Sequence, residues 1–241
     1  MRLEARALPI LSDNYAWLLH ASDGAVALVD PADGRACIAA IEADGGRLDL
    51  ILLTHHHDDH IAGTDEVREQ FGARVVGAAA DRHRLPKLDQ AVREGDTVAL
   101  GDCTLEVIET PGHTRGHISF FCPQGDVLIC ADTLFSLGCG RVIEGTMEEM
   151  FSSLQKLAKL PGDSLVCCGH EYTQSNAKFA LHVDPSNEAL RRRAEEVAQL
   201  RAERKPTVPS RLSDELAENP FLRAPDAQRF AELRREKDGF R

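Results

Sequence analysis

The chain has 241 residues, of which 43% are apolar, enough for one large domain or for one domain with an appendage. Its formal net charge of -11 argues against a protein that binds nucleic acid through a basic surface. Its seven cysteines are scattered and include no Cys-x-x-Cys pair, which argues against a disulfide framework and for a reducing compartment.

The N-terminal residues are charged, and the apolar runs of the chain are all shorter than a membrane-spanning helix requires. We therefore expect neither a signal peptide nor a membrane span, and we expect a cytoplasmic protein.

Short apolar runs separated by polar turns predict strands at residues 3–7, 16–19 and 25–30, and a helix follows at 36–43. The aliphatic run at 48–53 predicts a buried strand, and a short helix is expected to end near Gly72. Further strands are predicted at 75–80, 97–100, 104–110, 119–122, 127–131 and 164–168, whereas residues 83–95 show no clear pattern. A helix is predicted at 147–160, where Pro161 and Gly162 end it.

The character of the chain changes near residue 170. Residues 173–205 predict two charged helices with a break at 183–185, and residues 227–237 predict a last short basic helix. We therefore expect a catalytic domain at 1–170 and a helical, substrate-binding appendage at 171–241.

Four histidines and two aspartates occur within residues 55–60, directly after the predicted strand at 48–53. Because side chains alternate along an extended chain, His55 and His57 are expected to point the same way, and His56 away from them. A turn after them can bring Asp59 and His60 to a second position. Imidazole and carboxylate are ligands of zinc, iron and manganese, so the cluster predicts metal binding.

Other predicted strands also deliver a histidine or an aspartate where they end. The candidate ligands are then His55, His57, Asp59, His60, His113, Asp132 and His170. Seven ligands suffice for two ions if one carboxylate is shared, and Asp132 is the natural bridge because it follows its strand alone. Two ions a few ångström apart can activate water and polarise a carbonyl or phosphoryl oxygen. We accordingly predict catalytic roles for Asp59 and Asp132.

Two nearby residues compete with these assignments. His117 could replace His113, but the Pro111-Gly112 turn favours His113 and leaves His117 as a hydrogen-bonded structural histidine. Asp58 is expected to cap a helix or to hold a ligand histidine rather than to bind metal.

The pattern His55-x-His57-x-Asp59-His60, with His113, Asp132 and His170, resembles the metallo-β-lactamase superfamily. Further segments resemble its glyoxalase II (hydroxyacylglutathione hydrolase) family over nearly the whole chain, including the appendage. These segments are Thr-Pro-Gly-His-Thr, Asp-Thr-Leu-Phe, Gly-Cys-Gly-Arg, Cys-Gly-His-Glu-Tyr-Thr, Asn-Pro-Phe-Leu-Arg and Arg-Arg-Glu-Lys-Asp.

The resemblance implies an α+β fold, a four-layer αββα sandwich with a C-terminal helical appendage. It implies two divalent ions, with zinc favoured and iron or manganese as alternatives. One ion would be bound by His55, His57 and His113, the other by Asp59, His60 and His170, and Asp132 would be shared.

The implied substrate is S-D-lactoylglutathione, cut to glutathione and D-lactate in methylglyoxal degradation. Glutathione would be held by Arg141, Tyr172, Arg234 and Lys237, and cations suit its two carboxylates. Ile143 departs from the family pattern, which has a tyrosine there. Besides this small-molecule thioester we expect neither a nucleic-acid partner nor a membrane partner, and we expect a monomer.

Three other functions fit parts of the pattern. A mononuclear iron dioxygenase acting on glutathione persulfide has a related fold and overlapping ligands, but the helical appendage argues against it. A phosphodiesterase or nuclease of the same fold is disfavoured by the net charge of -11. A catalytically inactive binding protein is disfavoured by the intact set of seven ligands.

Overall fold

The computed structural model describes residues 3–240, which form two six-stranded sheets, a two-stranded hairpin and helices around them. The first sheet has the strand order β1-β2-β3-β4-β5-β6. Its strands are β1 (Glu4–Ile10), β2 (Asn14–His20), β3 (Val26–Val29), β4 (Leu50–Leu52), β5 (Arg74–Ala78) and β6 (Gln90–Val92). Strands β1 to β3 pair antiparallel and β3 to β6 pair parallel, so the sheet is mixed.

The second sheet has the order β14-β13-β10-β9-β8-β7. It comprises β7 (Thr97–Leu100), β8 (Cys103–Glu109), β9 (Ile118–Cys122), β10 (Val127–Ala131), β13 (Leu165–Cys168) and β14 (Ser210–Arg211). Strands β11 (Leu134–Phe135) and β12 (Gly138–Cys139) form a separate hairpin.

The apolar side chains of the first sheet are divided between its two faces. In β2, Trp17 and Leu19 lie in the core between the sheets, while Ala16 and Leu18 lie in a second core on the outer face. Strand β4 divides its residues in the same way. This alternation is the period of two expected of a strand buried on both sides.

Helices cover the outer faces of both sheets. Helices α1 (Gly34–Ala43) and α3 (Thr64–Phe71) contribute Cys37, Ile41 and Val67 to the outer core of the first sheet. Helix α4 (Met147–Leu157) packs Met150, Leu154 and Leu157 into the core that includes the second sheet. The expected four-layer αββα arrangement is therefore confirmed.

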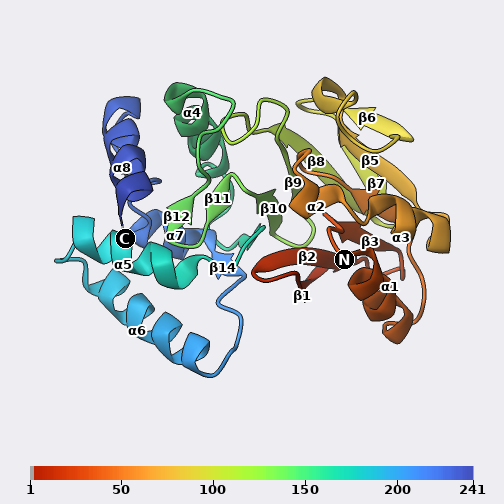
Figure 1. Cartoon of the computed structure of the whole chain (residues 1–241), viewed down its shortest axis with the longest axis horizontal. Helices are drawn as coiled ribbons and strands as arrows, with labels where there is room; N and C mark the ends of the chain where they lie inside the picture. The colour runs from red at the N-terminus through yellow and green to blue at the C-terminus, as the bar shows by residue number, and fades with distance from the viewer. Residues whose placement is uncertain (1–2, 241) are drawn as a thin grey trace.

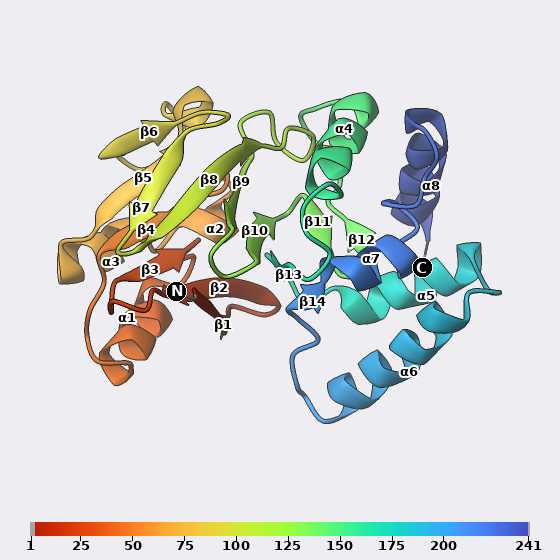
Figure 2. The same ribbon diagram turned by 180° about the vertical axis from the view of Figure 1, so that it is seen from behind.

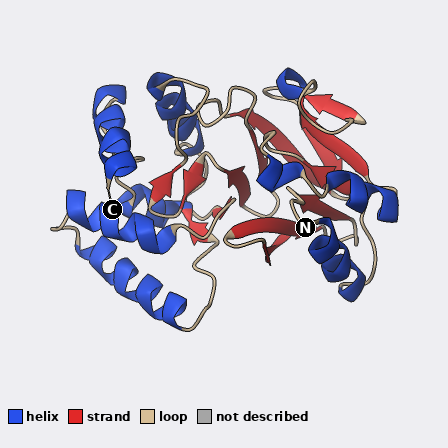
Figure 3. Cartoon of the chain, viewed as in Figure 1, coloured by secondary structure: helices blue, strands red, loops and turns tan. Residues whose placement is uncertain are grey.

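The C-terminal part of the chain is helical, as predicted. Helices α5 (Thr173–Val183), α6 (Glu188–Ala202), α7 (Leu212–Glu218) and α8 (Ala227–Gly239) gather at one end of the molecule, opposite α1 and α3 (Figure 1). The reverse view shows the same separation (Figure 2). Figure 3 shows mainly helices at that end and both strands and helices in the rest of the molecule. None of the helices within residues 3–240 is both long and apolar enough to span a membrane.

The two sheets meet at one edge, where backbone hydrogen bonds join them. The amide of Ile118 donates to Thr54 O over 2.9 Å, and the amide of Tyr15 donates to Gly169 O over 2.8 Å. The indole Nε1 of Trp17 donates to Cys168 O over 2.9 Å. These bonds bring β2 and the start of β9 to the ends of β4 and β13, and the candidate ligands lie in the loops at these positions.

The predicted strands and longer helices are confirmed with small shifts at their ends. The patternless stretch 83–95 contains the short strand β6, and α7, β11, β12 and β14 were not predicted. These elements have two to seven residues, too few to show a periodicity.

Candidate metal centre

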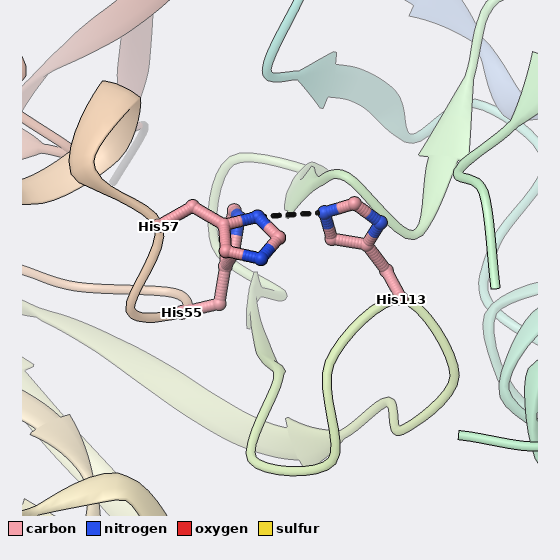
Figure 4. Close-up of side chains that lie close together, drawn as sticks. All are labelled: His55, His57 and His113. Carbon is pink, nitrogen blue, oxygen red and sulfur yellow. Dashed lines mark hydrogen bonds between the residues drawn. The ribbon is translucent and has the colours of Figure 1, made fainter. Parts of the chain in front are cut away.

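The first group of converging ligands is His55, His57 and His113. His55 and His57 follow β4, and His113 comes from the loop after β8 (Figure 4). The Nδ1 atom of His57 lies 3.0 Å from Nε2 of His113. The three residues offer ligand atoms that all lie within 4.8 Å of one another. His55 and His57 thus face the same centre, as the alternation along the strand end predicted.

The second group is Asp59, His60 and His170. Asp59 and His60 lie in the first turn of the short helix α2 (Asp58–Ile61), and His170 follows β13. Nε2 of His170 lies 3.4 Å from Nε2 of His60 and 3.5 Å from Oδ2 of Asp59. The turn therefore brings Asp59 and His60 to a second position. There they lie beside His170, which comes 110 positions after His60.

Asp132 lies between the two groups. Its Oδ1 is 3.4 Å from Nε2 of His60, and its Oδ2 is 3.5 Å from Nε2 of His113 and 3.4 Å from Nε2 of His170. The carboxylate thus contacts histidines of both groups. A Cβ at Gly169 would lie 2.3 Å from Oδ1 of Asp132 and 2.8 Å from Cε1 of His60, so only a glycine allows this close approach.

The backbone before Asp132 is irregular. The pairing of β10 with β13 shifts its register between Ile129 and Ala131, and Ala131 has a φ of 39°. A bulge of this kind re-aims the side chain that follows it, and such strained positions concentrate at functional sites. The irregularity directs Asp132 to the centre.

In four of the histidines, Nδ1 is hydrogen-bonded to a neighbouring group. This bond determines that Nε2 faces the centre. Nδ1 of His60 donates to Oδ2 of Asp30 over 3.0 Å, and Nδ1 of His170 donates to Oδ1 of Asp13 over 3.0 Å. Nδ1 of His113 donates to the carbonyl oxygen of Arg141 over 2.8 Å.

His55 is anchored through Thr54. Its Nδ1 lies 3.0 Å from the Thr54 hydroxyl, which itself donates to Asp30 over 2.6 Å. In each of the four histidines the anchored Nδ1 carries the proton, so Nε2 keeps a lone pair for a metal. Asp13 and Asp30 were not predicted. Asp30 ends the predicted strand 25–30 and could have been found by the rule that revealed Asp132.

The electrostatics of the centre are those of a cation site. Burial and the neighbouring histidines hold the pKa of His55 well below its ordinary value, so its imidazole is neutral. Burial opposes a charge on His60 too, but Asp132 and Asp30 outweigh it and raise the pKa of His60 to about 9. Burial alone would raise the pKa of Asp132, yet His60, His170 and His113 hold it low.

The residues present fit bound metal ions on two further observations. Nε2 of His55 and Oδ1 of Asp132 are buried and have no hydrogen-bond partner within residues 3–240. A buried polar atom without a partner costs free energy, and a metal ion would satisfy both atoms. The carboxylates around His60 also require a positive charge, which a divalent ion supplies.

The competing residues are not in the groups of converging ligand atoms within residues 3–240. His56 contacts Asp81 and Arg84, away from the centre. His117 is buried, with its Nδ1 3.0 Å from the Thr110 hydroxyl and its ring stacked on that of His55. Asp58 does not act as the expected helix cap, because His57 occupies the N-cap position of α2 and Asp58 is exposed in its first turn.

A cavity of about 440 Å³ opens beside the centre, between the catalytic sheets and the C-terminal helices. His113 and Asp132 are among the residues that line it. The rest of its wall includes Phe135, Cys139, Arg141, Tyr172, Ser175, Asn176, Arg234, Lys237, Asp238 and Phe240. The four residues expected to hold glutathione all lie in this wall.

These four residues differ in side-chain exposure and in the contacts that they make within the protein. The Arg141 side chain is 75% exposed, and the Tyr172 ring stacks on that of His170 with centroids 4.6 Å apart. Lys237 Nζ donates to the carbonyl oxygen of Ser175 over 3.0 Å and to its hydroxyl over 3.1 Å. The Arg234 side chain is only 5% exposed.

Two family profiles match adjacent parts of the chain. Residues 11–170 match the metallo-beta-lactamase superfamily, and residues 171–240 match the C-terminus of hydroxyacylglutathione hydrolase.

Curated relatives match the whole chain. The chain is 58% identical to the hydroxyacylglutathione hydrolase of Acidiphilium cryptum, covering 97% of this chain and 95% of the relative. It is 51% identical to the hydroxyacylglutathione hydrolase of Ruegeria pomeroyi, covering 100% of both.

Solved structures share the fold at lower identity. The B3 metallo-beta-lactamase BLEG-1 matches with a TM-score of 0.71 at 23% identity, over 91% of this chain and 99% of that one. The protein ETHE1 from Myxococcus xanthus matches with a TM-score of 0.71 at 24% identity, over 96% of this chain and 90% of that one.

Proposed function

The chain belongs to the metallo-beta-lactamase superfamily and, within it, to the hydroxyacylglutathione hydrolases, and on that premise we propose that it is a thioester hydrolase. It cleaves S-D-lactoylglutathione, and related S-2-hydroxyacylglutathiones, to glutathione and the free 2-hydroxy acid. For the lactoyl thioester the products are glutathione and D-lactate, which makes this the second step of methylglyoxal degradation.

One observation carries the proposal. The wall of one cavity includes Asp132, a candidate ligand histidine and the cations Arg141 and Lys237. S-D-lactoylglutathione carries two carboxylates on its tripeptide and a thioester at its cysteine sulfur, so cations suit one part of the substrate while the metal centre suits the other. In this division, residues 1–170 supply the chemistry and residues 171–241 complete the glutathione side.

Two divalent ions are proposed for the centre. His55, His57 and His113 would hold one, Asp59, His60 and His170 the other, and Asp132 would be shared. Zinc suits the imidazole-rich ligands best, and the same set accepts iron or manganese. When bound, such a pair supplies a Lewis acid for the thioester carbonyl and lowers the pKa of water to about 7.

The chain's own groups then orient the reactants. Asp132 is ionised because the surrounding histidines hold its pKa low against the effect of burial. Asp59 is 47% exposed and receives a hydrogen bond from Asn14 Nδ2 at 3.1 Å, which leaves its carboxylate able to orient the attacking water. The glutathione thiolate leaves without a general acid, since a free thiol has a pKa of about 8.5.

The proposed location is the cytoplasm. All seven cysteines are free and buried, as expected of a chain that relies on a core rather than on disulfides. Glutathione thioesters form where reduced glutathione is abundant, which is also a reducing compartment.

The proposal is tested by measuring the hydrolysis of S-D-lactoylglutathione and, in the same protein sample, the metal content by elemental analysis. We expect thioester cleavage without oxygen uptake and two ions per chain. One bound iron with oxygen consumption on glutathione persulfide would instead identify a persulfide dioxygenase. An Asp132→Ala variant should lose activity and at least one ion.

A further inference from the structure

Side chains from the C-terminal helices hold the backbone of the β11–β12 hairpin (residues 134–139). Asn176 of α5 donates to Ser136 O over 3.1 Å, and Glu215 of α7 accepts from the Leu137 amide over 2.7 Å. Asn219, directly after α7, donates to Phe135 O over 3.1 Å and to Gly138 O over 2.9 Å. Arg234 of α8 donates from Nη1 to Cys139 O over 2.9 Å. All four side chains are buried.

The hairpin in turn lies against the catalytic centre. Gly140, the residue after it, donates its amide to Thr133 O over 3.3 Å, and a Cβ there would lie 1.9 Å from the carbonyl oxygen of Asp132. The next carbonyl, of Arg141, accepts from Nδ1 of His113. Because this acceptor selects the nitrogen that His113 turns to the centre, the position of the hairpin determines the orientation of that ligand.

Contacts within the protein hold the Arg234 side chain in the cavity wall. Its Nη2 donates to Asp238 over 2.8 Å, and its guanidinium lies 5.2 Å from the centroid of the Phe221 ring. Of its three nitrogens only Nε is without a partner within the described chain. Arg141, in the same cavity wall, has an exposed side chain, so the two arginines differ in availability.

We propose that Arg234 and Asn219 are positioning residues for the reaction. They hold the hairpin so that the Arg141 carbonyl orients His113 and the backbone around Gly140 confines Asp132. The appendage then contributes to the metal centre itself, besides completing the glutathione side. The measurement of kcat on thioesters rests on the proposed function. The measurement of zinc release does not depend on it.

A comparison of two thioester substrates distinguishes a role of Arg234 in positioning the metal centre from a role in binding glutathione. One substrate is S-D-lactoylglutathione, and the other is the lactoyl thioester of N-acetylcysteamine, which lacks both glutathione carboxylates. The zinc-loaded Arg234→Met variant should lose about tenfold in kcat on both, because changes to groups that orient metal ligands typically cost 10–100-fold. A residue that only grips glutathione would raise KM for the first substrate and leave kcat on the second unchanged.

The release of zinc supplies a readout that does not depend on turnover. Zinc transfer from the loaded protein to a chromophoric chelator should be about tenfold faster in Arg234→Met than in the wild type. Arg234→Lys keeps one donor for Cys139 O and should restore most of the wild-type rate. Lys237→Met is the benchmark for a lost substrate contact, with a raised KM for the glutathione thioester and wild-type zinc release.

Asn219 provides the independent test, because it is fully buried and is absent from the cavity wall. Asn219→Ser should reproduce the faster zinc release and the lower kcat on both thioesters. Thermal unfolding of the metal-free variants separates these effects from global destabilisation. Wild-type zinc release in Arg234→Met and Asn219→Ser would overturn the inference. If the wild type cleaves neither thioester, the proposed function fails while zinc release still decides the positioning role.

Discussion

Asp30 and His60 form a buried pair in which the Oδ2 atom of Asp30 accepts a hydrogen bond of 3.0 Å from Nδ1 of His60. The same carboxylate accepts from the amide of Thr54 at 2.9 Å and from its hydroxyl at 2.6 Å. Through Thr54 it also fixes His55. One carboxylate therefore sets the orientation of a histidine in each of the two ligand groups, and this was not apparent from the sequence.

Replacing Asp30 by Asn should weaken zinc binding by about 10–100-fold, the usual cost of losing a group that orients a metal ligand. An amide keeps the size of the side chain but presents hydrogens where Asp30 accepts three bonds. Competition with a chelator of known affinity measures the effect. Asp33→Asn is the control, since Asp33 only caps α1 and asparagine caps equally well. Equal zinc affinity in the two variants would contradict the role of Asp30.

Lys237 should make kcat/KM depend on pH on the alkaline side. Burial, assisted by Arg234, lowers the pKa of Lys237 to about 8, so its positive charge is lost as the pH rises through that value. Loss of the charge removes a hydrogen bond to a glutathione carboxylate, and kcat/KM should fall by about tenfold between pH 7 and 9.5. Lys237→Arg stays charged over this range and should remove the decline. An identical alkaline decline in the variant would rule out Lys237 as its source.

Gly140→Ala should be destabilising, because the added Cβ would lie 1.9 Å from the carbonyl oxygen of Asp132. The backbone on one side must move, at a cost of about 1–3 kcal/mol in the free energy of unfolding. Urea unfolding of the metal-free protein measures this cost. Gly239→Ala is the matched control, since a Cβ at Gly239 meets nothing within 4 Å. Equal stability of the two variants would show that the contact at Gly140 relaxes freely.

Ile143→Tyr should tighten substrate binding. Ile143 is 58% exposed in the loop that carries Arg141, at the position where the family pattern implies a tyrosine. One added hydrogen bond of about 0.5–1.5 kcal/mol should lower KM for the glutathione thioester by about 2–10-fold. Ile143→Phe separates the ring from its hydroxyl. If both variants have the wild-type KM, position 143 does not contact the substrate.

Local patterns in the sequence predicted the strands and the candidate ligands, whereas the four-layer arrangement was implied by the resemblance to the superfamily. The aliphatic run at residues 48–53 is typical of a strand buried on both faces, and the polar residues at 55–60 closely follow it. The same pattern, a histidine or aspartate where a strand ends, identified His113, Asp132 and His170. Their convergence could be expected because the ends of these strands share one edge of the sandwich.

The sequence did not predict the groups behind the ligands, because their partners are remote. Asp13 holds a histidine 157 positions later, and Asn219 holds carbonyls more than eighty positions earlier. Such contacts leave no spacing to detect. The β11–β12 hairpin was not predicted for a different reason. Its two-residue strands are too short to show alternation, and its backbone is held by side chains that are distant in the sequence.

The most direct test of the account is a zinc titration of the metal-free protein, with S-D-lactoylglutathione hydrolysis measured after each addition. If two ions share Asp132, activity should reach its maximum at two equivalents of zinc per chain. Full activity at one equivalent, or no hydrolysis at any zinc concentration, would contradict it.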